Sequence, residues 1–463
     1  MRNNLSLQYF SQYWLSQNRR KWQPALIIAG VLLFVALVAT QASQRQLTLL
    51  LLLVAGVATV LVLLRQPNIG FILVLLAGMF IPYSGPAGLN VAILLVALML
   101  GLWVLDMLIV KRQFKLVAPR PIRPLFVFLL ISFFSFLMGQ FRWFNFAGQA
   151  PLDAQLGGFA VFVLSGGAFL LAANLIRELR WLKRLTWVFI ALGAAYVFGR
   201  MIGLPFIDSI YQHGFAAGSM FWTWLAALTF SQAVLNNHLR SRWRIILFGI
   251  VLATFYVAYV QAGSWKSGWM PPLVAVAAII AIRYWKQAIF LTPFILVAGY
   301  FLVTNAIATE QYSWGTRVDA WLIVTEITSV NPILGLGFAN YYWYTPLFPI
   351  RGWRVSFNSH SQIVDIFAQT GVLGLLSFFW FLWELGRLGW RLREKVSDGF
   401  AHAYVYGALG GLAGTLFAAS LVDWVLPFVY NIGLNGFRAS VLAWIFLGGL
   451  VSVEQIYLHK VSD

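Results

Sequence analysis

Apolar stretches of about 20 residues recur along the chain, and clusters of Lys and Arg lie between them. A helix of that length spans the hydrocarbon core of a bilayer, which is roughly 30 Å thick. Of the 463 residues, 61% are hydrophobic and 10% are charged, against about 25% charged residues in soluble proteins. The sequence therefore predicts an all-α, polytopic transmembrane helical bundle, and it excludes a soluble enzyme, a disordered protein and a coiled coil.

The hydropathy pattern predicts about fourteen spans. They occupy residues 24–40, 47–64, 68–83, 89–110, 124–140, 156–176, 184–202, 217–236, 245–262, 269–282, 287–304, 361–385, 401–424 and 438–456. The two weakest are 269–282, which opens with Pro271-Pro272, and 68–83, which ends at Pro82. The preceding residues 1–23 are too polar for a cleaved signal peptide and are expected to form a cytoplasmic lead-in.

Positive charge gives an independent check on this topology, because cytoplasmic loops are enriched in Lys and Arg. All but eight of the 32 Lys and Arg residues fall in alternate loops that fourteen spans place on one side. This bias predicts cytoplasmic termini, and it explains the net charge of +18 without nucleic acid as a partner. The eight exceptions are predicted to lie on the outer side: Arg45, Arg142, Arg200, Lys266, Arg317, Arg351, Arg354 and Arg438.

Several kinds of site are excluded by the residues present. The chain has no cysteine, so it has no disulfide, Fe–S cluster or thiolate zinc site. The run Gly335-Leu336-Gly337-Phe338 is too short for a nucleotide-binding loop and indicates a turn. No metal-ligand cluster and no serine-hydrolase motif occurs, and we expect neither a metal ion nor a cofactor.

One long segment, about residues 305–360, lies between predicted spans and contains three of the outer basic residues. Long loops are uncommon unless they are functional or disordered. This loop is too aromatic and too poor in charge to be disordered. We expect an ordered outer-face subdomain lying on the membrane interface through its Trp and Tyr side chains: Trp314, Trp321, Tyr341, Tyr342, Trp343, Tyr344 and Trp353.

A helix is predicted to begin inside this segment at Thr316, with Asp319 in capping-box position, and to end near Thr328 before Asn331-Pro332. Arg317 would then lie in the first turn, where the helix dipole disfavours a cation unless an anion is bound. The pattern therefore favours an anion site at Arg317. The alternatives are that Arg317 pairs with Asp319 or reaches lipid phosphates.

The next predicted helix carries Ser361, Asp365 and Gln369 at intervals of four residues. This polar stripe would enter the membrane facing protein or water. His360 precedes it and is a candidate to take a proton from a hydroxyl group, since its unperturbed pKa is about 6.5. The alternative is an interfacial histidine bonded to the backbone. The spacing places His360 and Asp365 on different helix faces, so no hydrogen-bonded dyad is expected.

These residues together resemble the O-antigen ligase and O-antigen polymerase family of bacterial membrane glycosyltransferases. The resemblance is carried by Thr316-Arg317-x-x-x-Trp321, Asn331-Pro332-x-x-Gly335-x-Gly337-x-x-x-Tyr341, Ser359-His360 and Gly371-Val372-Leu373-Gly374-Leu375. It implies a shared core at 184–385, including the loop 305–360, flanked by transmembrane helices at 1–183 and 386–463.

The resemblance implies an enzyme of the bacterial cytoplasmic membrane that acts on its outer face. Such an enzyme transfers a glycan from an undecaprenyl-diphosphate carrier to an acceptor hydroxyl on a glycan or lipid, with inversion and without metal. A transporter or flippase of a lipid-linked or anionic substrate is the competing class. It would predict charges near the bilayer midplane and an internal repeat, and the sequence contains neither. A non-catalytic scaffold is a third possibility.

The resemblance also implies roles for individual residues. Arg317 would bind the diphosphate and His360 would meet the acceptor hydroxyl. A second cation is implied within Gly263-Ser264-Trp265-Lys266-Ser267, where Lys266 replaces the arginine usual in the family. Other residues complete the expected set: Arg200, Arg351 and Arg354 as substitute cations, and Asp365, Gln369 and Ser361 as supporting polar residues.

Overall fold

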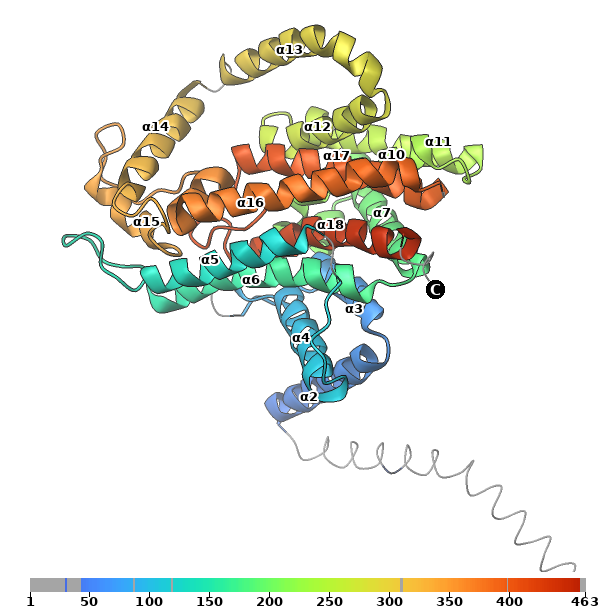
Figure 1. Ribbon diagram of the computed structural model, residues 1–463, viewed down its shortest axis with the longest axis horizontal. Coiled ribbons are helices and arrows are strands. Elements are labelled where there is room, and N and C mark those ends of the chain that lie inside the picture. Colours follow the sequence, from blue (N-terminus) through green and yellow to red (C-terminus); the bar gives the residue numbers. More distant parts are fainter. Residues whose placement is uncertain are drawn as a thin grey trace, which may run out of the picture. The chain divides into compact units, whose positions relative to one another are not determined.

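A computed structural model of the chain describes residues 30, 43–85, 88–117, 120–308, 311–397 and 399–458. The described residues are mostly helical and contain no β-strand (Figure 1). The chain forms two compact units, Met1–Arg65 and Gln66–Asp463. In the first unit the long described helix is α2 (Gln44–Arg65). Apart from residue 30, the predicted lead-in and the predicted span 24–40 lie outside the described residues.

The second unit contains the remaining described elements. They are α3 (Pro67–Phe80), α4 (Val91–Leu105), η2 (Asp106–Val110), α5 (Ile122–Met138), α6 (Leu152–Leu175), α7 (Leu179–Met201), α8 (Ile207–Ile210), α9 (His213–Ala216), α10 (Ser219–Leu235), α11 (Ser241–Phe255), η3 (Tyr256–Gln261), α12 (Lys266–Arg283), α13 (Trp285–Ala308), α14 (Gln311–Thr328), α15 (Asn340–Tyr344), η4 (Thr345–Leu347), α16 (Gln362–Lys395), α17 (Gly399–Leu421), η5 (Leu434–Gly436) and α18 (Phe437–Leu458).

Every predicted span from 47–64 onward coincides with a helix or with a helix and its π-helical extension. Seven helices among the described residues are long and apolar enough to cross a membrane, and they identify a membrane protein. They are Val91–Val110, Leu152–Leu175, Leu179–Met201, Ser241–Gln261, Gln362–Lys395, Gly399–Leu421 and Leu434–Tyr457. Two other predicted spans form shorter apolar helices, α3 with 14 residues and α5 with 17. The count of about fourteen spans stays a prediction.

The helices of the second unit pack in pairs around a buried central helix (Figure 1). The apolar part of α18 is completely buried and packs against α6. On other sides, α10 contacts α11, α12 and α17, while α16 lies between α5 and α17. Close packing of this kind needs small residues: a Cβ on Gly448 of α18 would lie 2.5 Å from the carbonyl oxygen of Phe169 on α6.

Arg438, one of the cations predicted on the outer side, has a structural role. Its side chain is 1% exposed and donates hydrogen bonds to the carbonyl oxygens at the C-terminal end of α3, including those of Ala77 at 3.1 Å and Ile81 at 2.8 Å. It also donates to Tyr83 O at 2.7 Å. Ala77 O also accepts from Ile81 N at 3.3 Å, so the guanidinium chiefly serves the carbonyls beyond the helix, Ile81 O and Tyr83 O.

Helix α16 is broken at Gly371, whose φ of 67° and ψ of −171° are not helical. The turn after α14 pairs with the broken backbone, with Leu336 N donating to Ala368 O at 2.9 Å and Val372 N donating to Pro332 O at 2.8 Å. A Cβ on Gly371 would lie 2.2 Å from Ile333 O. The glycine motifs of the two segments therefore pack against each other, and their contacts fix the position of the break in α16.

The described residues of the segment 305–360 include α14, α15 and η4, but two of its aromatic residues do not lie at an interface. Tyr341 and Tyr344 are completely buried in a hydrophobic cluster with Phe428. Their rings supply apolar area to the core under this segment, which outweighs the interfacial preference of tyrosine. Trp353 by contrast is 71% exposed. The outer-face position of the segment stays a prediction.

Candidate functional site

His360 lies in the extended chain just before α16, with a positive φ of 50°. This backbone conformation costs about 1 kcal/mol or more for a residue with a side chain, so neighbouring contacts must hold it. Both flanking serines supply such contacts. Ser359 Oγ donates to Asp365 Oδ1 at 2.7 Å and accepts from Ser361 N at 3.0 Å, while Trp321 Nε1 donates to Ser359 O at 2.8 Å.

The predicted polar stripe helps to hold the backbone at His360 in place. Ser361, Asp365 and Gln369 are all at least 97% buried, so the stripe faces protein as expected. Asp365 Oδ1 accepts a hydrogen bond from Tyr341 Oη at 2.5 Å, and the hydroxyl of Ser359 bonds to the same oxygen. Asp365 therefore fixes the loop beside His360. Asp365 and His360 form no dyad, in agreement with the prediction.

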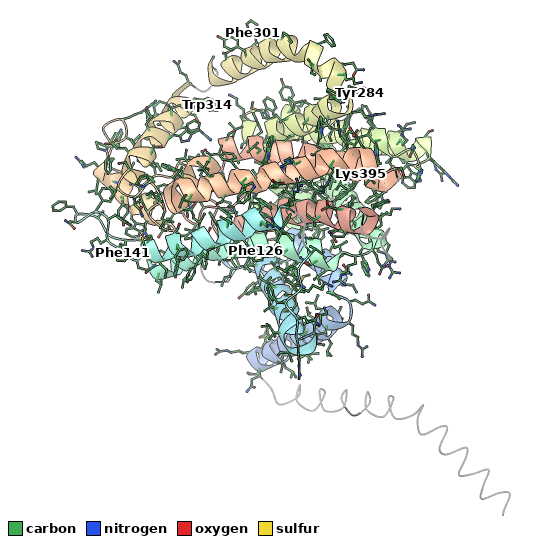
Figure 2. All side chains as sticks on the ribbon, viewed as in Figure 1. Phe126, Phe141, Tyr284, Phe301, Trp314 and Lys395 are labelled. Atoms are coloured by element: carbon green, nitrogen blue, oxygen red, sulfur yellow. The ribbon has the colours of Figure 1, made fainter. Side chains whose placement is uncertain are left out.

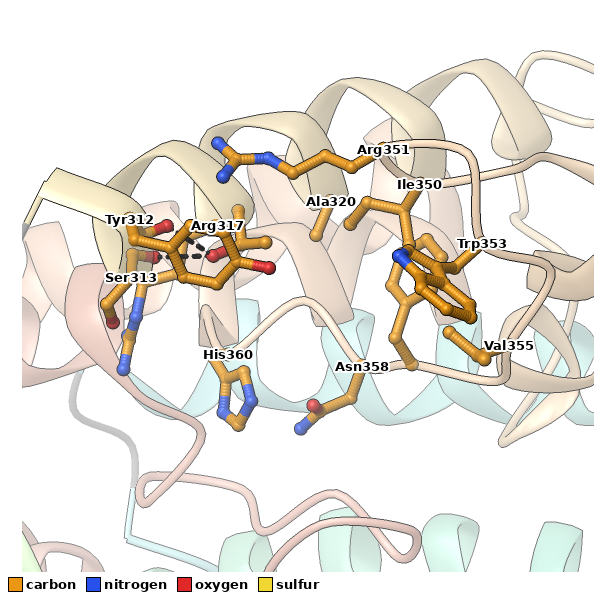
Figure 3. Close-up of a pocket in the computed structure, with 12 residues that line it drawn as sticks. Tyr312, Ser313, Arg317, Ala320, Ile350, Arg351, Trp353, Val355, Asn358 and His360 are labelled. Carbon is orange, nitrogen blue, oxygen red and sulfur yellow. Dashed lines mark hydrogen bonds between the residues drawn. The ribbon is translucent and has the colours of Figure 1, made fainter.

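A pocket of about 380 Å³, here called the His360 pocket, opens beside this loop (Figure 3). Arg317 and Tyr312 line it from α14, and Arg351 and Trp353 line it from the loop that follows η4. Its walls therefore combine one imidazole, two guanidinium groups and several aromatic rings. This mixture of apolar surface and convergent polar groups is typical of a small-molecule site.

Arg317 lies in the second turn of α14, because the helix begins at Gln311 rather than at Thr316. The predicted capping box is therefore wrong. Thr316 Oγ1 donates to Tyr312 O at 2.6 Å, as hydroxyl groups do inside helices. Asp319 accepts a hydrogen bond from Arg351 Nε at 2.7 Å. The helix dipole consequently gives no argument for an anion at Arg317.

Arg317 does lie beside a second cation, Lys266. Arg317 and Lys266 line the same small pocket of about 130 Å³, here called the Lys266 pocket, together with Ser264 and Ser267. Arg317 also lines the His360 pocket, so it stands at the junction of the two. Its Nη1 donates to Leu421 O at 2.6 Å, which orients the guanidinium.

Two residues that the sequence reasoning missed also adjoin His360. Asn431 Nδ2 lies 3.4 Å from His360 Nδ1 and donates to Asp423 Oδ1 at 2.7 Å. Both residues belong to the connection between α17 and α18. The sequence did contain one indication of these residues. Asp423 is an acidic residue at the end of an apolar segment, and such residues are unusual and often functional.

Burial, together with the charge of Arg317, shifts the pKa of both His360 and Asp423. Burial lowers the pKa of His360, and the positive charge of Arg317 lowers it further. Burial raises the pKa of Asp423 to about 6, although its hydrogen bond from Asn431 and the charge of Arg317 oppose this. The lowered pKa favours the neutral imidazole of His360, and a neutral imidazole has one ring nitrogen that can accept a proton.

The three substitute cations occupy different places. Arg351 lines the His360 pocket, but it pairs with Asp319 and lies over the ring of Tyr312 at 4.8 Å. Arg354 lies outside the residues lining that pocket and donates to Leu347 O at 3.3 Å. Arg200 pairs with Asp208 in a third pocket of about 500 Å³. That pocket adjoins the Lys266 pocket through Trp265, which lines both.

The site thus brings together a neutral histidine, a buried carboxylate and two cations in adjoining pockets. Within the described residues, no three His, Cys, Asp or Glu side chains are placed to hold a metal ion. Comparison of the chain with protein-family models gave no match, and comparison with curated protein sequences gave none either.

Proposed function

We propose that this protein is a membrane glycosyltransferase of the O-antigen ligase or polymerase type. In this proposal it transfers a glycan from an undecaprenyl-diphosphate carrier to an acceptor hydroxyl. The observation that carries the proposal is the position of Arg317, which lines the Lys266 pocket on one side and the His360 pocket on the other. A phosphate-binding pair of cations and a proton-accepting imidazole therefore adjoin each other.

The Lys266 pocket would hold the diphosphate. The guanidinium of Arg317 can engage phosphate oxygens with two parallel N–H donors, whereas Lys266 contributes a compact charge. Negative charge accumulates on the diphosphate as its bond to the sugar breaks, so both cations stabilise the transition state more than the bound donor. The bond from Arg317 to Leu421 O holds the guanidinium in place before the substrate arrives.

The His360 pocket would hold the reacting sugars. Trp353 and Tyr312 offer ring faces along the pocket wall, and Asn358 offers a polar amide. His360 would orient the acceptor hydroxyl or remove its proton as the hydroxyl oxygen attacks the anomeric carbon. Asn431, which also donates to Asp423, lies against Nδ1 of the ring, and Nδ1 would exchange this contact for the hydroxyl when it accepts the proton.

The reaction would be a single displacement. The acceptor oxygen forms a bond to the anomeric carbon, the bond from that carbon to the diphosphate oxygen breaks, and undecaprenyl diphosphate leaves with the electron pair. The hydroxyl proton passes to His360 and then to solvent. One displacement inverts the anomeric configuration, and no covalent glycosyl-enzyme forms. The proposed setting is the outer face of a bacterial cytoplasmic membrane.

The test uses purified protein in detergent with an undecaprenyl-diphosphate-linked glycan and candidate acceptors. His360→Ala should lower the rate by a factor of roughly 10²–10⁴, the range for a general base. Arg317→Gln should lower it by roughly 10²–10³, the range for one transition-state donor. His238→Ala and Arg242→Gln are matched controls, because both residues lie outside the two pockets. Product length separates single transfer from polymerisation.

Two results would contradict the proposal. One is full activity in both His360→Ala and Arg317→Gln. The other is binding of the native donor and acceptor without any reaction, in which case transport of the lipid-linked glycan should be measured in vesicles. Inhibition by a metal chelator would refute the metal-independent mechanism but not the proposed glycosyl transfer.

A further inference from the structure

A second large concavity lies between α16 and α17, far along α16 from the His360 pocket. It is a groove of about 1000 Å³. Trp380, Trp383 and Trp390 line it from one face of α16, and Leu412 and Leu416 line it from α17. Trp383 is 66% exposed. On a membrane-spanning helix such exposed apolar side chains face lipid acyl chains.

Arginines gather at one end of this groove. Arg387 lines both the groove and a smaller pocket of about 130 Å³, whose other walls include Arg120 and Arg391. Two glutamates face them, since Arg387 pairs with Glu384 at 3.4 Å and Arg391 pairs with Glu454. The side chains of Arg387 and Arg391 nevertheless remain 51% and 41% exposed. Three arginines against two glutamates leave this end positive.

The dimensions of the groove match one leaflet of a bilayer. Phe379, at its apolar end, precedes Arg387 by about 12 Å of helix. One leaflet has a hydrocarbon layer of roughly 15 Å, half of the total core thickness. Trp390 lies beyond Arg387 and contacts the ring of Trp285 with centroids 6.5 Å apart. Tryptophan is enriched at this level, beside the lipid headgroups. Lys395 ends the same helix (Figure 2).

We propose that this groove is a binding site for an anionic phospholipid. Its phosphate would bind at Arg120, Arg387 and Arg391, and an acyl chain would lie along the tryptophans between α16 and α17. The positive end selects a lipid with net negative charge, because basic pockets between transmembrane helices bind anionic headgroups. Gly386 and Ala413 leave room for the chain beneath the tryptophans. This site is independent of the proposed glycosyl transfer.

The test is native mass spectrometry of the purified full chain in detergent, titrated with phosphatidylglycerol or with phosphatidylcholine. Arg120→Gln removes one headgroup contact and should weaken phosphatidylglycerol binding by a factor of about 5. Arg387 and Arg391 are retained, because their partners Glu384 and Glu454 are buried. Arg242→Gln removes one exposed charge elsewhere and should bind as the wild type does.

A second variant tests the groove without altering charge. A Cβ at Gly386 would meet Leu412 Cδ2 at 3.9 Å, an ordinary contact, so Gly386→Leu can be accommodated and fills the groove. Gly386→Leu should also bind phosphatidylglycerol more weakly than the wild type does. Equal retention of both lipids by the wild type would overturn the proposal. Unchanged phosphatidylglycerol binding in Gly386→Leu would overturn it as well, because the headgroup alone would then account for binding.

Discussion

Substituting Gly371 by alanine should destabilise the protein, because this position is the break in α16. Its φ of 67° with ψ of −171° is a conformation that costs a residue with a side chain roughly 1–3 kcal/mol. The added Cβ would lie 2.2 Å from Ile333 O, so the turn that carries Ile333 must move away. That movement weakens backbone hydrogen bonds such as Leu373 N to Ile333 O at 3.3 Å. Each is worth about 1 kcal/mol.

Together these effects predict a loss of about 4 kcal/mol, which corresponds to a fall in melting temperature of at least about 4 °C for a chain of this size. The assay is thermal unfolding of the purified protein in detergent. Gly386→Ala is the control in the same helix, since its Cβ would make only an ordinary contact at 3.9 Å. We expect it to stabilise by about 0.5–1 kcal/mol. Equal changes in melting temperature for Gly371→Ala and Gly386→Ala would refute this reasoning.

Three further predictions concern buried or shifted charges. If the neutral imidazole of His360 is the active form, activity is lost as pH falls through a pKa below 6.5, and NMR titration of Arg317→Gln should show that pKa raised. Because burial raises the pKa of Asp423 to about 6, its ionisation destabilises the fold as pH rises through that value. Asp423→Asn should therefore raise the melting temperature at pH 8 and leave it unchanged below about pH 4, the ordinary range for aspartate; a constant difference would contradict this. Arg438→Gln should cost at least about 3 kcal/mol in thermal unfolding, with exposed Arg242→Gln near zero, because it leaves the end of α3 unsatisfied.

The positions of the helices could be predicted from the sequence because a span of apolar residues has few alternatives to a helix in lipid. The C-terminal end of α14 at Thr328 was also predictable, since Asn331-Pro332 follows it. The beginning of α14 could not be predicted from the sequence. Thr316 and Asp319 satisfy the local pattern of a helix start, but the preceding residues Gln311–Gly315 continue the helix, and that choice depends on their packing.

The residues of the candidate site could be proposed one by one from the sequence, but their arrangement in space could not. His360, Arg317 and Lys266 could be named from local patterns and from the resemblance. Their arrangement in two adjoining pockets depends on α14 placing Arg317 beside Lys266 at the start of α12 and beside His360. Asp423 and Asn431 come from a connection 60 or more residues away from His360, so no local pattern links them to it.

The break at Gly371 also changes the depth at which chemistry could occur in a bilayer. Helix α16 has 34 residues and a length of about 51 Å, far more than a hydrocarbon core of roughly 30 Å. The part after Gly371 is about 36 Å long and is sufficient to cross the core by itself. The part carrying Asp365 can then lie at headgroup level rather than among acyl chains. In the proposed reaction, the diphosphate of the donor could then stay at the depth of the lipid phosphates while the sugar reaches His360.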